Sequence, residues 1–379
     1  VLLFYPMALC SPIFILTYGI KLARFIHQSI GESIFIKTSY LALLQLNLFY
    51  RFNILESLLF QVFRKLSGAM FLLCLVSAGL PNTSHLSYLH ELFIQPLNIL
   101  DIDILTIVGQ PNLFINLVWL SVLVLLPASM KKKLLSQFMI YAQVLFFLVD
   151  ASVRVVYIDV GQGDATLIKY PHHQGAALID TGKSNQYSKL KAQLYKSGLK
   201  EIDTLIITHP DEDHNGSQAE IMKQFKVKQL VTESPVEIDS PINFYFLLEN
   251  RSASDSNDAS LIITFKVMDC QFLFTGDVSR AIEKALLKEY PLLKADILKL
   301  GHHGSRTSSD ERFLHQMNPK LAIISSDPNS YSHPHPEVMR SLVDLKINSL
   351  QTSEVSSIEI IITKYVSFVR TRKHFYFLN

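Results

Sequence analysis

Residues 208–216, Thr-His-Pro-Asp-Glu-Asp-His-Asn-Gly, carry the clearest chemical pattern in the sequence. They follow an aliphatic segment that predicts a strand at 203–208, so their side chains fan out from a turn at a strand end. Imidazole nitrogens and carboxylate oxygens are ligands for Zn, Mn or Fe, and such a group can hold two cations close together. Because histidines bracket the acids, an ordinary acidic surface turn is a poor explanation. The candidate ligands are His209, Asp211, Asp213 and His214.

Two further predicted strands end in ligand-type residues. Asp277 follows the apolar segment 271–274, and His302 and His303 follow 297–300 in Gly-His-His-Gly-Ser. Alone, a Gly-Asp pair is usually a turn, and a His-His pair can be a polar surface feature. Three strand ends with such side chains in one domain instead predict that the segments meet at one cavity and bind cations.

The elements that position these residues are predicted from the pattern after Asp150. Strands are expected at 153–160, 176–179, 204–208, 261–267, 271–274, 297–300 and 321–325. Helices are expected at 188–197, 218–225, 279–290, 310–317 and 336–345. Alternating strands and helices indicate a layered α/β domain, which we assign to residues 151–379.

Residues 1–150 are much more apolar and predict a membrane-embedded helical domain. Segments 1–20, 66–80, 102–126 and 134–149 approach the roughly 20 apolar residues of a membrane-spanning helix. Segment 41–63 carries Arg51 and Glu56, which predicts a bundle-facing or interfacial position. A large soluble helical core is the alternative, but so many uncharged segments of this length are rare in soluble domains.

Charge predicts the orientation of these spans. Arg64, Lys65 and the lysines at 131–133 are expected to be cytoplasmic, and segment 81–101, without Lys or Arg, to lie outside. The last span would then place the C-terminal domain outside the cytoplasmic membrane. The chain starts within an apolar run without a secretory signal, so we expect a membrane helix and a start inside a larger protein.

The overall composition excludes simpler classes. Lys and Arg number 35 against 33 Asp and Glu, which gives no global signature of nucleic-acid binding. Cys10, Cys74 and Cys270 are too few and too scattered for a disulfide framework or a thiolate metal site.

The order of the motifs resembles the metallo-β-lactamase superfamily: Asp180 in Leu-Ile-Asp-Thr-Gly, then 209–214, then Asp277, then Gly-His-His-Gly-Ser. Three features within it resemble the ComEC competence proteins, which are bacterial DNA-uptake channels of the inner membrane. These features are Asp-Val-Gly-Gln-Gly-Asp at 159–164, the His-x-Asp-x-Asp-His spacing, and Tyr-Ser-His-Pro-His-Pro at 331–336. The resemblance implies an αββα sandwich over 153–345 and a partial multi-span domain before it. The family's N-terminal β-barrel and earlier helices have no counterpart here, so the chain resembles a truncated member.

The resemblance also implies ligand roles. His209 and Asp211 would hold one divalent ion, Zn or Mn, and Asp213 and His214 a second. Asp277 would bridge them, and His302 or His303 would be the last histidine; we favour His302 as the first residue past the strand. The superfamily's middle histidine is not visible, and Asn257 occupies the comparable loop. Asp180 would orient the ligand loop from behind.

Other polar residues are expected near the cavity. Gln162 and Asp164 lie in a turn that Gly161 and Gly163 make tight, although a simple turn remains the alternative. His333 and His335, each held extended by a following proline, could contact substrate or protonate a leaving group. Ser305 follows the histidine pair. His172 and His173 are interpreted as surface residues in a hairpin turn, and 370–377 as either a basic-aromatic patch or an ordinary terminal strand.

The expected reaction is phosphodiester hydrolysis by a two-cation site, with Asp213 accepting a proton from water. By resemblance, the enzyme is a DNA nuclease that degrades the non-transported strand during natural transformation, beside a membrane channel. Its partners would be single-stranded DNA without sequence preference, the bilayer and other DNA-uptake proteins. The alternatives are hydrolysis of a choline phosphoester or lactone, a transport component with a structural metal domain, and a non-functional fragment.

Overall fold

The computed structural model describes residues 34–54, 106–111, 113–125, 129–234, 236–249, 253, 255–327 and 333–378. The chain divides into two compact units, Val1–Phe147 with Tyr195–Gly198, and Leu148–Leu194 with Leu199–Asn379.

The first unit is helical in its described part. It contains α2 (Ile34–Leu48), α5 (Leu113–Leu125), α6 (Met130–Val149) and a short antiparallel pair, β1 (Arg51–Asn53) and β2 (Thr106–Val108). Its core gathers around the fully buried Trp119, with Leu46, Phe52 and Leu123.

None of the helices in the described residues is both long and apolar enough to cross a bilayer. The segment predicted as a span at 102–126 is interrupted by β2, and α5 has only 13 residues, about 20 Å of helix. Pro111, which cannot donate a backbone hydrogen bond, precedes this helix. The 20-residue α6 carries three lysines in its first turn, and α2 ends at Leu48 within the segment predicted at 41–63. The predicted spans at 1–20 and 66–80, with Arg64, Lys65 and loop 81–101, lie outside the described residues.

The second unit contains two β-sheets. The eight-stranded sheet has the order β16-β15-β14-β3-β4-β5-β6-β7. Its strands are β3 (Val153–Tyr157), β4 (Thr166–Lys169), β5 (Ala176–Ile179), β6 (Glu201–Ile206), β7 (Lys226–Val231), β14 (Ile358–Ile362), β15 (Ser367–Arg370) and β16 (Phe375–Phe377). The six-stranded sheet has the order β13-β12-β11-β10-β9-β8. Its strands are β8 (Phe244–Leu247), β9 (Ile262–Val267), β10 (Cys270–Phe274), β11 (Ile297–Lys299), β12 (Leu321–Ile324) and β13 (Asn348–Gln351).

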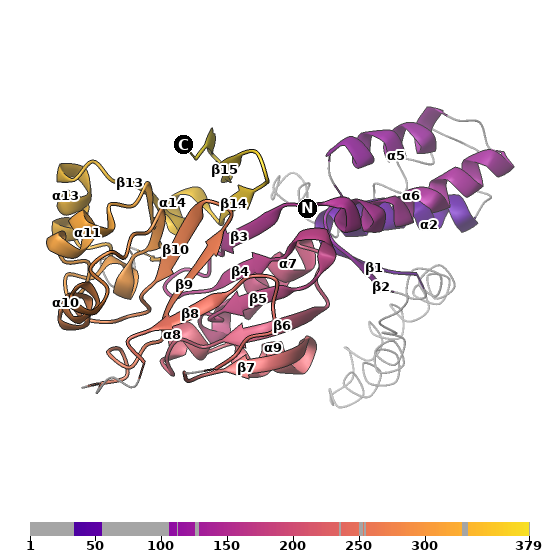
Figure 1. Ribbon diagram of the computed structural model, residues 1–379. Coiled ribbons are helices and arrows are strands. Elements are labelled where there is room, and N and C mark those ends of the chain that lie inside the picture. Colours follow the sequence, from indigo (N-terminus) through magenta and orange to yellow (C-terminus); the bar gives the residue numbers. More distant parts are fainter. Residues whose placement is uncertain are drawn as a thin grey trace, which may run out of the picture. The chain divides into compact units, whose positions relative to one another are not determined.

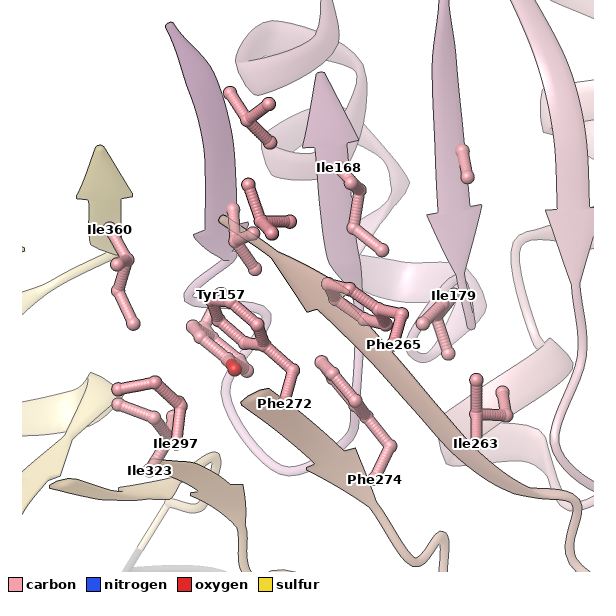
Figure 2. Packing of buried hydrophobic residues seen from close by; sticks show 14 of the residues in the cluster. Tyr157, Ile168, Ile179, Ile263, Phe265, Phe272, Phe274, Ile297, Ile323 and Ile360 are labelled. Carbon is pink, nitrogen blue, oxygen red and sulfur yellow. The ribbon is translucent and has the colours of Figure 1, made fainter. Parts of the chain in front are cut away.

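The two sheets pack face to face over one apolar core. Alternation along β10 sends Phe272 and Phe274 into this core and Leu273 to the other side of the sheet. Figure 2 shows Phe272 and Phe274 meeting Tyr157 from the opposite sheet. The Tyr157 and Phe274 rings stack at 5.7 Å between centroids. Burial of large side chains from both sheets is the main force that holds the layers together.

Helices cover the outer faces of both sheets. The six-stranded sheet packs against α10 (Arg280–Glu289), α11 (Glu311–Met317) and α13 (Pro336–Asp344) through a second apolar cluster. Beside the eight-stranded sheet lie α7 (Tyr187–Lys196) and α9 (Gln218–Gln224), as Figure 1 shows, and α14 (Thr352–Val355) connects β13 to β14. The architecture is the predicted αββα sandwich. Strands β5, β6 and β7 run parallel to one another, as do β10 to β13, so the carboxyl ends within each set share an edge.

Candidate metal centre

The predicted ligand segments leave the carboxyl ends of strands in both sheets. Asp180 follows β5 and the segment 208–214 follows β6, while Asp277 follows β10 and His302 and His303 follow β11. Distances between their side chains, given below, show that the structure brings these separate segments together at one place.

Hydrogen bonds to the Asp180 carboxylate fix the position of the segment that follows β6. Its carboxylate accepts hydrogen bonds from the Thr208 backbone N–H at 2.7 Å and from the Thr208 hydroxyl at 2.8 Å. It also lies 2.8 Å from Nδ1 of His214, which makes Nδ1 the donor and leaves Nε2 without a proton in the neutral ring. Asp180 adopts a left-handed backbone with φ 60°, a conformation that costs energy in a non-glycine residue and is kept where the surroundings require it.

His214 and His303 converge on Asp277. Nε2 of His214 lies 3.4 Å from one Asp277 oxygen, and Nε2 of His303 lies 3.6 Å from the other. Nε2 of His303 is also 3.2 Å from Asp213. The carbonyl of Ser325, at the end of β12, accepts a hydrogen bond from Nδ1 of His303 at 2.8 Å. The carboxylate and the imidazole rings therefore face a common point.

His209 and Asp211 occupy the adjoining side of this cluster. The His209 ring lies 4.0 Å from the His214 ring, and its Nε2 is 3.8 Å from Asp211. Asp211 is the N-terminal capping residue of the short helix α8 (Glu212–Asn215), and its side chain is 42% exposed. Asp211 thus faces solvent at the mouth of the cluster, while His209 is buried.

The two neighbouring histidines differ in burial. His303 is 1% exposed, whereas the side chain of His302 is 29% exposed, with its Nε2 3.9 Å from Asp277. Both adopt left-handed backbone in the turn η6 (Gly301–Gly304). The residue favoured from sequence, His302, therefore lies at the rim, and the structure places His303 among the buried candidate ligands.

The donor set fits divalent cations. Among the described residues, two groups of buried side chains bring their ligand atoms together. Within each group, the ligand atoms lie within 4.8 Å of one another. One group is Asp164, His214 and His303, and the other is His209, His214 and Asp277. Several of these atoms are buried without any hydrogen-bond partner, namely Nε2 of His209, His214 and His303 and one oxygen each of Asp164 and Asp277. Such groups are costly to bury unsatisfied, and coordinated cations would satisfy the histidine nitrogens and the Asp277 oxygen.

Electrostatics couple the histidines to the acids. Burial acts to lower the pKa of His214, but Asp277 and Asp180 outweigh it and raise that pKa well above its usual value. For His303, burial is likewise outweighed by Asp277 and Asp164, which raise the pKa to about 9. Burial acts to raise the pKa of Asp277, but the two histidines hold it well below its usual range. Positive charge on the histidines therefore balances the ionised acids, as bound cations would.

The predicted turn at 159–164 supports the ligand segment. Gly163 has φ +141°, and a Cβ there would lie 2.5 Å from the Asp213 carbonyl oxygen, so only glycine fits. The Asp164 backbone N–H donates to that carbonyl at 3.0 Å. The Asp164 side chain is buried, 2.8 Å from Nζ of Lys299 and 3.6 Å from Nδ1 of His303. The Gln162 side chain accepts a hydrogen bond from the Asp327 backbone.

The remaining predicted residues lie around the cluster. The His333 ring is 6.0 Å from that of His302, whereas Nδ1 of His335 caps α13 by accepting the Glu337 N–H. The side-chain oxygen of Asn257 is buried without a hydrogen-bond partner. Ser305 contacts Thr307 and shapes the loop after His303. Positions 331 and 332 of the Tyr-Ser-His-Pro-His-Pro motif lie outside the described residues.

Lys299, Thr208 and Ser260 also belong to the site, although none of them was predicted as a site residue. Ser260 accepts the Asp277 backbone N–H at 3.1 Å, which fixes the start of that loop. The signal that could have identified Lys299 is a lysine at the end of an otherwise aliphatic strand, three residues before His302.

A family model described as the metallo-beta-lactamase superfamily matches residues 158–238. ComE operon protein 3 of Bacillus subtilis (strain 168) is 31% identical over 318 residues, covering 69% of this chain and 41% of that protein. Recombination protein 2 of Haemophilus influenzae is 31% identical over 211 residues, covering 50% and 26%. Competence protein ComA of Neisseria gonorrhoeae is 28% identical over 219 residues, covering 54% and 31%. The chain thus spans less than half the length of each relative. The similarities, the ligand segment and the two-sheet fold identify the chain as a homologue of the ComEC-type competence proteins with a metallo-β-lactamase domain.

Proposed function

We propose that the second unit is a metal-dependent phosphodiesterase that acts on single-stranded DNA during natural transformation. The observation that carries this proposal is the set of unpartnered buried nitrogens and oxygens on His209, His214, His303 and Asp277. The relatives support the role in transformation, because one of them is named a competence protein and another a ComE operon protein. Degradation of the strand that is not taken up would explain why a hydrolase accompanies DNA uptake.

Two divalent cations would be held by different sets of residues. Asp213, His214, His303 and Asp277 surround one position, and His209, Asp211 and Asp277 surround the other. Bound Zn²⁺ or Mn²⁺ supplies Lewis-acid polarisation of the phosphoryl group and of the attacking water. Because Asp211 is half exposed and the nearby His214 is shared with the first position, we expect the second position to bind its ion more weakly.

The chain's own residues have distinct tasks in this proposal. Asp213 lies at the edge of the cluster, within reach of His303, and is placed to accept a proton from water. His302 and His333, at the exposed rim, are placed to contact the phosphate or to protonate the leaving oxygen. Asp180 and Asp164 orient histidines from behind and do not touch substrate. His335 caps a helix, so we assign it a structural role before any catalytic one.

The first unit is proposed to associate with the inner membrane, with the hydrolase unit outside the cytoplasm. The apolar composition of residues 1–150 and the position of the lysines at 131–133 support this orientation. We also propose that the chain binds other DNA-uptake proteins, because its relatives include a competence protein and a ComE operon protein.

The test uses the purified 379-residue chain, stripped of metal and then supplied with Mn²⁺ or Zn²⁺. We expect up to two ions per chain by elemental analysis and cleavage of both labelled single-stranded DNA and a small aryl phosphodiester. Asp277→Ala should reduce both rates by at least about 100-fold, since it removes a ligand shared by both positions. Asp344→Ala, an exposed carboxylate at the end of α13, is the matched control and should cleave normally.

The outcomes separate the alternatives. Cleavage of the small ester without DNA cleavage would favour a hydrolase of another phosphoester or a lactone. If no metal binds, the hydrolase proposal fails and a structural or non-functional domain remains.

A further inference from the structure

The outer face of β15 and β16 carries exposed aromatic rings. Register pairs Phe368 with Phe377 and Arg370 with Phe375, so these four side chains share one face. The rings of Phe368 and Phe375 lie 5.0 Å apart, and those of Phe375 and Phe377 lie 6.2 Å apart. Phe375 is 60% exposed and Phe377 is 58% exposed. We call Phe368, Phe375 and Phe377 the phenylalanine row.

The row lies at the edge of a sheet, where such exposure is a liability. β16 is the terminal strand of the eight-stranded sheet, and all three of its residues are exposed. Exposed apolar edge strands tend to pair with other chains unless something covers or charges them. A ligand that covers these rings would remove that cost.

The positive charge of the residues around this edge strand favours an anionic ligand. Residues 360–379 contain four Lys or Arg and no Asp or Glu, against a net charge of only +2 for the whole chain. Lys364, Arg372 and Lys373 are exposed. Arg370 is held by Glu359, the last acid of the chain, at 2.8 Å. Exposed cations therefore flank the phenylalanine row in the sequence.

A hollow of about 270 Å³ adjoins the row. Phe377 lines it together with Met268, Lys320, Lys364 and Tyr365. Two acids, Asp269 and Asp296, also line it, and Asp296 is engaged by Lys320 at 3.3 Å and by the Gln271 backbone N–H at 2.9 Å. Tyr365 is 85% exposed. The hollow is large enough for one nucleobase between aromatic walls.

From these features we propose that the phenylalanine row and the hollow form a binding surface for single-stranded nucleic acid, separate from the metal centre. Bases stack on exposed rings without sequence preference, and neighbouring cations follow the phosphates. A bilayer surface is the competing occupant, but interfacial segments bury the Trp, Phe or Leu side chains of an amphipathic helix beside their cations. Here the exposed apolar groups are rings on a β-strand.

The test measures fluorescence anisotropy of a labelled 20-nucleotide oligothymidylate with the full chain in EDTA. Without divalent metal no cleavage occurs, so the result is independent of the proposed nuclease activity. Phe375→Ser with Phe377→Ser should weaken binding about tenfold or more, since each base–ring stack contributes substantially. Tyr245→Ser, an exposed aromatic on β8 at the edge of the other sheet, is the matched control and should leave affinity unchanged.

A second variant keeps the proposal testable if the serine substitutions unfold the edge. Arg372→Ala with Lys373→Ala should reduce the slope of log affinity against log salt by about 1.4, which is about 0.7 per lost phosphate contact. The proposal is overturned if both variants bind the oligonucleotide like the parent. It is also overturned if the variants lose binding only to anionic phospholipid vesicles, which would assign the surface to a membrane.

Discussion

The candidate centre depends on residues held in uncommon backbone conformations. Asp180, His302 and His303 all have positive φ, at 60°, 48° and 55°. Left-handed backbone in non-glycine residues persists only where surrounding contacts enforce it, and it is common at functional sites. Here it lets two successive histidines diverge, so that one reaches the buried Asp277 and the other remains at the rim.

Lys299 is predicted to stabilise the centre through Asp164. Both side chains are buried, with Nζ 2.8 Å from the carboxylate. Lys299→Met leaves a buried carboxylate uncompensated, which should lower the free energy of unfolding by about 3–5 kcal/mol. Urea denaturation measures this loss, and metal titration should show weaker binding because Asp164 also faces His303.

The control for that variant is Lys320→Met, which breaks the pair with Asp296. Lys320 is half exposed, so we expect a loss below about 1 kcal/mol. Adding Asp164→Asn to Lys299→Met should restore part of the stability. Equal effects of the two lysine variants would contradict the importance of the buried pair.

At the scale of residues, sequence could name the ligand types but not all of their positions. The strong signal at 209–214 arises because histidines and acids share one turn. By contrast, the choice between His302 and His303 depends on backbone angles, which residue types alone do not reveal. Lys299 was missed because a lysine in a strand normally points to solvent.

At the scale of elements, most of the predicted strands are apolar segments, but the apolar strands β4, β8 and β14 were missed as well as some polar ones. Expected strands such as 176–179 and 271–274 match β5 and β10 to within a residue. The strands β7 and β13 were missed because Lys-Val-Lys-Gln and Asn-Ser-Leu-Gln lack an apolar pattern. Their place at sheet edges explains this, since an edge strand buries less of its surface.

Glu283 joins α10 to the start of α11 and is predicted to make stability depend on pH. Its buried carboxylate accepts the backbone N–H groups of Ser309 at 2.7 Å and Asp310 at 2.8 Å, and burial raises its pKa to about 8. A raised pKa in the folded state means that this contribution is full below about pH 4.5 and is lost as pH rises through about 8. We expect a loss on the order of 2–4 kcal/mol across that range.

Chemical denaturation at pH 5 and pH 8.5 measures this effect, with Glu283→Gln as the comparison. The glutamine variant cannot ionise, so the part of the pH dependence that comes from this residue should disappear. The variant should also be less stable at low pH, because its amide N–H₂ cannot accept the second backbone hydrogen bond. An unchanged pH dependence in the variant would show that Glu283 is already ionised at pH 5.

At the scale of the whole molecule, the second unit contains a complete architecture. Both sheets and every candidate ligand lie between residues 153 and 377. The helices, by contrast, were expected to span a bilayer, and no helix within the described part of the first unit meets that requirement. Hydropathy alone cannot distinguish one long membrane-spanning helix from a strand followed by a short helix. Both β2 and α5 lie within the single apolar segment 102–126.

The two units are predicted to unfold separately, and the single tryptophan of the chain can show it. Trp119 is fully buried in the core of the first unit, whereas most strands belong to the second. During urea denaturation of the full chain, tryptophan fluorescence should therefore report the first unit, and circular dichroism in the strand region mainly the second. We expect the two transitions to differ in midpoint, since units with separate cores need not share one cooperative transition.

Phe272→Ala, which empties part of the sheet core, should lower only the dichroism midpoint, because the second unit loses about 3–5 kcal/mol of its free energy of unfolding. Coincident transitions that move together in the variant would mean that the two units fold as one.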